Sequence, residues 1–336
     1  MNGLKINKIL AEKVIAILKS QKILDQELKI SSDGEYVIIP IIHEEIECLL
    51  EGIEYEIIPH NFDLRQRRNK NLKEYLSHIL PRDLEVPTSF DTIGKIAVIY
   101  IKDELLDYKQ VIAEGLIKTS PKISTVFRKK RAVSGKFRLR ELEFLAGKND
   151  SVALHREYGV SLLVDLQKVY FSPRLSSEHW RITQMVRDGE TILDMFTATG
   201  IFALLICKYH RASVTALDHN PAGINALDQN IRRNKLKGEI IPICSDAMCF
   251  ESNDLFDRVI MNHPSGAEKF LMKADSLLKS GGFMHFYTFV PIENYETEAS
   301  KILRQHLPRY TVVHVQRIRQ FSPNEYHVAV DAIKLN

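Results

Sequence analysis

The stretch TILDMFTATGIFALLIC, residues 191–207, decides the fold class. Its pattern predicts a short buried strand, a turn of small residues and an apolar helix that begins at Ile201. Small residues in such a turn allow the backbone to approach a ligand closely. The turn contains Gly200 but not the G-x-G-x-x-G pattern of dinucleotide sites, so a ligand without a pyrophosphate group is favoured.

Strand-like and helical patterns alternate on both sides of this stretch. The strand-like runs cover residues 191–196, 213–218, 239–245, 258–262 and 282–289. Such alternation predicts an α/β fold with a parallel sheet and helices on both faces. Two more runs, 311–318 and 327–333, flank a turn at Pro323 and predict an antiparallel pair. This ending is similar to the Rossmann-like, seven-stranded sheet of class I methyltransferases that use S-adenosylmethionine (SAM).

Acidic residues follow three of these strands, at the edge where open parallel sheets bind ligands. Asp194 ends the first strand. Asp218 ends the second, 24 positions later, where an acid is suited to the two ribose hydroxyls of a nucleoside. Asp246 follows the third strand and is a candidate acceptor for an adenine amino group.

Each acid also has an ordinary interpretation, in which Asp194 orients a loop, Asp218 ends a strand in solvent and Asp246 caps a helix. Their repetition at successive strand ends favours a cofactor site. SAM has no phosphate and suits a turn without the dinucleotide pattern. The candidate cofactor-binding residues are Asp194, Phe196, Thr197, Thr199, Gly200, Asp218, Asp246 and Asn262.

Length and composition indicate a globular protein. The chain has 336 residues, of which 45% are hydrophobic and 26% charged, enough for two or three domains. We expect a small N-terminal domain over residues 1–60, a middle domain over 61–168 and a catalytic domain over 169–336.

Cysteine usage and hydropathy bear on the cellular setting. The four cysteines form no C-x-x-C pair, which predicts a reduced, cytoplasmic setting, and no metal site is expected. No run approaches the roughly 18 apolar residues that a membrane span needs, so we expect no membrane partner.

The net charge of +3 hides an uneven distribution. Residues 33–56 contain eight carboxylates and no Lys or Arg, whereas residues 118–140 contain nine cations and no acid. Phe127 and Phe137 interleave the basic segment, as expected for a surface that holds a phosphate backbone. A solvated basic face is an equally good interpretation of this segment taken alone.

A series of short segments spans most of the chain. They are LPRDL at 80–84, PTSFD at 87–91, GKFRLRELE at 135–143, LAG at 145–147, VYFSPRLSSEH at 169–179, DMF at 194–196 and DRVIMN at 257–262. Together and in this order they resemble the archaeal and eukaryotic tRNA (guanine37-N1)-methyltransferases of the Trm5 family, including its archaeal Trm5a-like branch.

The resemblance implies transfer of the SAM methyl group to N1 of guanosine 37, beside the anticodon, by a monomer. It implies an N-terminal domain that recognises the tRNA elbow, a middle RNA-binding domain and a catalytic domain that receives the anticodon loop. By motif, Glu178 matches the general base, Arg138 the arginine that contacts the guanine, and Asn262 with Pro264 the N-x-P motif of the target pocket. Without the resemblance, Glu178 is better explained as an early helix residue beneath a serine cap.

Several residues depart from the family pattern. TATGI at 197–201 replaces the usual Ala-Gly-Val-Gly-Pro, His263 replaces a leucine, and His179 replaces an arginine. Three alternatives stay open, the first and third of which follow from these changes and the second from a related archaeal enzyme. The chain could methylate C7 of a wyosine precursor such as 4-demethylwyosine at position 37, transfer the aminocarboxypropyl group of SAM instead, or bind tRNA with a decayed cofactor site.

Overall fold

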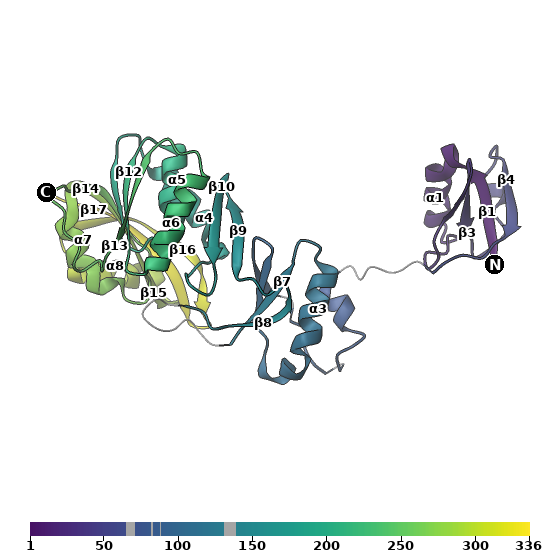
Figure 1. The fold of residues 1–336 in the computed structure, drawn as a ribbon, viewed down its shortest axis with the longest axis horizontal. Helices are drawn as coiled ribbons and strands as arrows, with labels where there is room; N and C mark the ends of the chain where they lie inside the picture. Colours follow the sequence, from purple (N-terminus) through teal and green to yellow (C-terminus); the bar gives the residue numbers. More distant parts are fainter. Residues whose placement is uncertain (65–70, 82, 88, 131–138) are drawn as a thin grey trace. The chain divides into compact units, whose positions relative to one another are not determined.

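The computed structural model describes residues 1–64, 71–81, 83–87, 89–130 and 139–336. The chain forms two compact units, residues 1–70 and residues 71–336 (Figure 1). Within the described ranges, no helix has the length and apolar character needed to cross a membrane.

The first unit is a four-stranded antiparallel sheet with a covering helix. Its strands are β1 (Asn2–Asn7), β2 (Ser31–Asp33), β3 (Tyr36–Pro40) and β4 (Tyr55–Pro59), in the order β2-β3-β1-β4. Helix α1 (Ala11–Ser20) buries Val14 and Leu18, which are four positions apart and therefore lie on one helix face. These two side chains form one core with Leu4 and Ile39 of the sheet.

The second unit begins with a smaller α/β sheet. Its strands are β5 (Phe90–Ile93), β6 (Ile96–Ile99), β7 (Thr125–Lys129) and β8 (Leu142–Gly147), in that order. Strands β6 and β7 are parallel because helix α3 (Lys109–Thr119) returns the chain between them. Helix α2 (Leu72–Leu76) packs beside α3 and buries Leu72 and Leu76 in the same core.

The larger sheet has seven strands in the order β13-β12-β11-β14-β15-β17-β16. They are β11 (Thr191–Asp194), β12 (Ser213–Asp218), β13 (Glu239–Cys244), β14 (Phe256–Met261), β15 (Leu278–Pro291), β16 (Tyr310–Ser322) and β17 (Glu325–Lys334). The first five are parallel, and β17 is antiparallel to both β15 and β16. The expected parallel sheet with a terminal hairpin is therefore confirmed.

Helices cover both faces of this sheet (Figure 1). They are α4 (Ser176–Met185), α5 (Ile201–Tyr209), α6 (Pro221–Arg233), α7 (Leu271–Leu277) and α8 (Tyr295–His306). Short 3-10 turns occupy Lys8–Leu10, Glu47–Leu49, Asp103–Tyr108, Pro173–Leu175 and Ala267–Phe270. Asn220 caps α6 by accepting a hydrogen bond from the Ala222 amide, and Pro221 occupies its first turn.

A separate hairpin, β9 (Val152–Glu157) and β10 (Val160–Asp165), packs against α5 and α6. Asn230 of α6 accepts from the Leu163 amide at 2.7 Å and donates to its carbonyl at 3.1 Å. Asn234 makes the same pair of bonds to Ser161, at 2.9 and 2.8 Å. The hairpin precedes residue 169, yet its backbone groups are satisfied by a helix of the large sheet.

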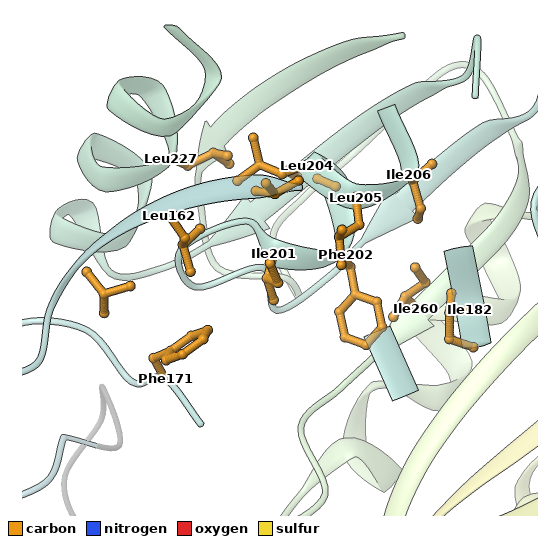
Figure 2. Close-up of a cluster of buried hydrophobic side chains, with 14 of the residues drawn as sticks. Leu162, Phe171, Ile182, Ile201, Phe202, Leu204, Leu205, Ile206, Leu227 and Ile260 are labelled. Carbon is orange, nitrogen blue, oxygen red and sulfur yellow. The ribbon is translucent and has the colours of Figure 1, made fainter. Parts of the chain in front are cut away.

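The core beneath α5 positions the cofactor turn. Ile201, Phe202, Leu204 and Leu205 of α5 pack with Leu162 of the hairpin and with other buried side chains (Figure 2). Because every residue from Ile201 to Cys207 is buried, the start of this helix is fixed relative to the strand before it.

Replacing Leu204 with Ala is expected to lower the free energy of unfolding by about 2–5 kcal/mol, because the fully buried side chain leaves a cavity. Urea unfolding would measure the change. Met272→Ala is a suitable control because Met272 is 61% exposed on α7. Equal effects of the two substitutions would contradict this account of the core.

Candidate active site

A cavity of about 630 Å³ opens at the carboxyl edge of the parallel strands. Residues that follow β11, β12, β13 and β14 form one part of its wall, and residues of β15, β16 and β17 form another. The sequence-predicted residues that line it are Phe196, Thr197, Thr199, Asp218, Asp246, Asn262 and Pro264. Asp194, Gly200 and Glu178 lie outside its lining, and Arg138 lies outside the described residues.

The turn after β11 has an unusual backbone. Ala198 has φ of +49° and Gly200 has φ of +85°, both in the left-handed region. Glycine is favoured at position 200, because L side chains rarely adopt this φ and a Cβ atom there would force the buried Leu227 side chain to shift. Ala198 accepts the conformation with its methyl group and directs its amide to Asp218 Oδ2 at 2.8 Å. The missing first glycine of the family pattern is therefore accommodated by a strained alanine.

Asp218 is held by two backbone groups. Its Oδ2 accepts from Ala198, and its Oδ1 accepts from the Asn220 amide at 2.8 Å. Burial raises the pKa of the carboxyl, although these amide hydrogen bonds oppose the shift. Each carboxylate oxygen has a further lone pair and Asp218 lines the cavity, so it can accept two hydroxyl donors.

Asp194 lies behind the turn instead of on the cavity surface. It is fully buried beside the Thr197 hydroxyl and the Phe196 amide. Burial raises the pKa of its carboxyl to about 7. The group therefore changes charge near neutral pH, at a position that supports the cofactor turn.

Asn262, His263 and Pro264 follow β14 and line the cavity together. The His263 ring stacks on Phe196, with ring centroids 4.9 Å apart and planes at 29°. Phe270 meets the edge of Phe196 at 5.0 Å. This part of the wall combines flat rings with the polar edge of Asn262.

Another part of the cavity wall comes from residues that were not candidates from the sequence. Phe289 and Phe321 stack with centroids 3.8 Å apart, and Arg319 and His327 complete the surface. No local motif marks these four residues. Phe289 ends the predicted run 282–289, and the predicted hairpin leads to the other three, because β17 pairs with β15 and places His327 opposite Phe289.

Three cations converge on one buried carboxylate at the cavity. Asp91 Oδ2 lies 2.7 Å from Lys129 Nζ and 3.6 Å from an Arg140 nitrogen, and its Oδ1 lies 2.5 Å from Arg174 Nε. Burial is the largest cause that lowers the pKa of Lys129. Lys129 and Arg140 line the cavity, and the Arg140 guanidinium lies over the Tyr170 ring. One carboxylate leaves this group with excess positive charge.

Glu178 lies in the first turn of α4 and is 3% exposed. Its Oε2 accepts from Arg181 Nε at 2.7 Å, while its Oε1 accepts from Arg181 Nη2 at 2.8 Å and from the Tyr287 hydroxyl at 2.6 Å. The Tyr287 ring lies near Phe202 and His327, which line the cavity. The carboxylate is therefore one side-chain layer behind the wall, whereas Asn262 is on it.

His179, the next residue, does line the cavity. Its Nδ1 lies 2.7 Å from Oε1 of Glu157, which is 5% exposed. Burial opposes ionisation of Glu157, but His155, whose Nε2 lies 3.6 Å from Oε2, and the hydrogen bond from His179 lower its pKa to about 2. An ionised Glu157 therefore orients the His179 ring.

Three family models match the chain in order. Residues 3–47 match the tRNA methyltransferase 5 N-terminal domain, residues 72–151 the TYW2 N-terminal domain and residues 153–312 the TRM5/TYW2 methyltransferase domain.

Curated relatives match over nearly the whole chain. The Methanocaldococcus jannaschii "tRNA (guanine(37)-N(1))-methyltransferase Trm5b" is 35% identical over 99% of this chain and 98% of its own length. A Pyrococcus horikoshii "tRNA(Phe) (4-demethylwyosine(37)-C(7)) aminocarboxypropyltransferase" is 28% identical over 77% of this chain and 95% of its own. The Trm5b name gives no support to the Trm5a-like branch.

Solved structures are similar over the full length. A complex of aTrm5 with tRNALeu has a TM-score of 0.88 at 34% identity, with both chains covered completely. Methanocaldococcus jannaschii Trm5 in complex with adenosine has a TM-score of 0.68 at 32% identity, again with complete coverage.

The seven-stranded sheet, the cavity at its carboxyl edge and the methyltransferase-domain match define a SAM-dependent methyltransferase. The similarity extends through both N-terminal regions as well. The chain belongs to the Trm5 family of tRNA (guanine37-N1)-methyltransferases.

Replacing Asp218 with Asn is expected to weaken SAM binding about tenfold or more, because one acceptor for the ribose hydroxyls and the negative charge are lost. Isothermal titration calorimetry would measure the dissociation constant. Asp228→Asn on α6 removes the same charge away from the cavity lining and should leave binding unchanged. Unchanged affinity in the Asp218 variant would contradict the assignment.

The free energy of unfolding of the protein without ligand should fall as pH rises from about 4 to 7, relative to Asp194→Asn. The raised pKa means that the folded state favours protonated Asp194. The resulting contribution to the free energy of unfolding is complete below the pKa of the unfolded state and is lost as the pH rises through the pKa of the folded state. The difference amounts to roughly 1.4 kcal/mol per unit of pKa shift. Urea unfolding over this pH range tests it, and parallel pH dependences would contradict it.

Proposed function

We propose that this chain transfers the methyl group of SAM to N1 of guanosine 37 in tRNA. The observation that carries the proposal is the cavity that joins Asp218 and the Asn262-His263-Pro264 turn in one enclosure. The full-length similarity to a tRNA (guanine37-N1)-methyltransferase supports the same reaction.

The residues present suit SAM. Asp218 offers two acceptor oxygens for the ribose hydroxyls, and Asp246 would accept from the adenine amino group. Thr197 and Thr199 line the cavity beside the tight turn that ends at Gly200, where we place the methionine part of SAM. Asp194 would support that turn from behind. When bound, SAM supplies a methyl group on a positively charged sulfur, which a nucleophile can attack.

The target base imposes the next requirement. N1 of neutral guanine carries a proton, which must leave before N1 can attack a methyl group. We assign Glu178 as the proton acceptor, which requires its carboxylate to exchange its Tyr287 hydrogen bond for one to the base. As the proton leaves, negative charge spreads to O6, and we assign Arg138 to stabilise it. Asn262 and Pro264 would line the pocket that receives the base.

The RNA-binding roles follow the order of the regions. We assign residues 1–60 to the tRNA elbow, residues 61–168 to RNA binding and residues 169–336 to catalysis, in a monomeric cytoplasmic enzyme. Lys129, Arg140 and Arg174 around Asp91 supply excess positive charge where the phosphate backbone of an anticodon loop would enter. A base leaves a single-stranded loop at lower cost than it leaves a duplex.

Aminocarboxypropyl transfer to a wyosine precursor is the second candidate. The Pyrococcus horikoshii relative named as an aminocarboxypropyltransferase matches this chain over 95% of the relative's length. Retention of Asn262 and Pro264, the N-x-P pattern, favours methyl transfer. Methylation of C7 and loss of catalysis are further outcomes that the same assay distinguishes.

The test is nucleoside mass spectrometry of tRNA treated with the protein and SAM. We expect N1-methylguanosine from tRNA that carries guanosine 37 and no incorporation when adenosine replaces that base. A nucleoside that is heavier by the aminocarboxypropyl group would overturn the proposal in favour of aminocarboxypropyl transfer. A methylated wyosine derivative together with unmodified guanosine would overturn it in favour of C7 methylation. Absence of both product and SAM binding would identify a tRNA-binding protein.

A further inference from the structure

Glu178 is one end of a buried chain of charged groups. Arg181 follows it, bonded to Asp331 through Nη1 at 2.5 Å and Nη2 at 3.2 Å. Asp331 Oδ1 lies 2.6 Å from His285 Nδ1, and His285 Nε2 lies 2.6 Å from Arg258 Nη1. Arg258 ends the chain at Glu190, at 2.8 and 3.1 Å.

The hydrogen bonds fix the charge of the middle of this chain. Arg258 can only donate, so Nε2 of His285 accepts and its Nδ1–H donates to Asp331. Burial lowers the pKa of His285, which keeps the ring neutral. Burial opposes ionisation of Asp331, but hydrogen bonds from His285 and Arg181 lower the pKa of its carboxyl. Asp331 is therefore an anion at a position with no solvent exposure.

Two carboxylates consequently accept hydrogen bonds from one guanidinium. Arg181 donates from Nε to Glu178, from Nη1 to Asp331 and from Nη2 to both. An arginine that served Glu178 alone would stabilise its ionised form more strongly. Asp331 thus reduces the stabilisation that Arg181 gives to the ionised form of Glu178. The Tyr287 hydroxyl, which donates to Glu178 at 2.6 Å, stabilises that ionised form.

We infer that Asp331 and Tyr287 are positioning residues for methyl transfer, which act in opposite directions on the ability of Glu178 to take the guanine proton. The inference rests on the proposed role of Glu178 as the acceptor. The Glu178 carboxylate would keep enough ion pairing with Arg181 to stay in position. It would also be able to exchange the hydrogen bond from Tyr287 for one from the guanine.

The titratable and charged groups around Glu178 come from five elements. They are His179 and Arg181 on α4, His285 and Tyr287 on β15, His327 and Asp331 on β17, Arg258 on β14, and His155 with Glu157 on β9, which reach it through His179. Among these described groups, Arg181 and Tyr287 donate hydrogen bonds to the carboxylate itself, and Asp331 bonds both to Arg181 and to His285.

The test is the pH dependence of methyl transfer in a single turnover, measured with saturating SAM and subsaturating tRNA, so that the profile reports the groups of the enzyme before the guanine binds. Asp331→Asn should move the acid side of the profile to lower pH by roughly one unit and slow transfer near neutral pH, because a neutral amide competes less than a carboxylate with Glu178 for Arg181. Tyr287→Phe should move the acid side to higher pH, because the carboxylate loses a donor while the buried ring remains.

The controls separate this inference from the proposed function. Asp257→Asn removes an ion pair in the same sheet, between Asp257 Oδ1 and Lys279 Nζ at 2.8 Å. It should leave the pH profile of methyl transfer unchanged. Glu178→Gln should slow transfer while SAM binding persists. Normal transfer in Glu178→Gln would overturn the role of Glu178 and the inference together, and loss of transfer in His179→Gln alone would assign the proton to His179 instead.

A different result would overturn the inference but leave the role of Glu178 intact. In that result Glu178→Gln slows transfer, while the pH profiles of Asp331→Asn and Tyr287→Phe shift in the same direction or do not shift. Should Asp331→Asn fail to fold, as judged by SAM binding and thermal unfolding, the direction of the Tyr287→Phe shift decides. A shift to higher pH supports the inference, and an unmoved profile or a shift to lower pH overturns it.

Discussion

The two amide hydrogen bonds to Asp218 join the two turns that form the cofactor side of the cavity. One amide belongs to the turn after β11 and the other to the turn after β12, and the two strands lie side by side in the sheet. Because one carboxylate accepts from both, the left-handed backbone at Ala198 and the cap of α6 are fixed together. The cavity depends on this constraint, since both turns form its wall.

Much of the sheet could be predicted because its signals are local. The run 213–218 has the observed bounds of β12, since its β-branched and apolar residues lie between the polar ends Ser213 and Asp218. β15 begins at Leu278, four positions before the predicted run, because the pairing of Phe256 with Leu278 extends the ladder through polar and glycine residues. Such pairing depends on the neighbouring strand and leaves no local pattern.

The polar parts of the site show the limit of sequence analysis more clearly. Arg181 and Asp331 are 150 positions apart, and Asp91 and Arg174 are 83 apart, yet each pair meets within hydrogen-bond distance. Motif positions placed Asn262 and Asp218 on the cavity, where the structure has them. The same reasoning gave Glu178 a role without revealing the partners that hold its carboxylate, because only the assembled sheet brings those partners together.

The asparagine bonds between α6 and the β9–β10 hairpin constrain how the chain can be divided for expression. A fragment that starts at residue 169 would strip Leu162 and its neighbours from α5 and leave Asn230 without the backbone groups it pairs with. Exposed apolar surface and an unsatisfied buried amide would both favour aggregation of such a fragment. A fragment that begins ahead of Val152 retains the hairpin and is the better unit for crystallisation or for grafting onto another RNA-binding module.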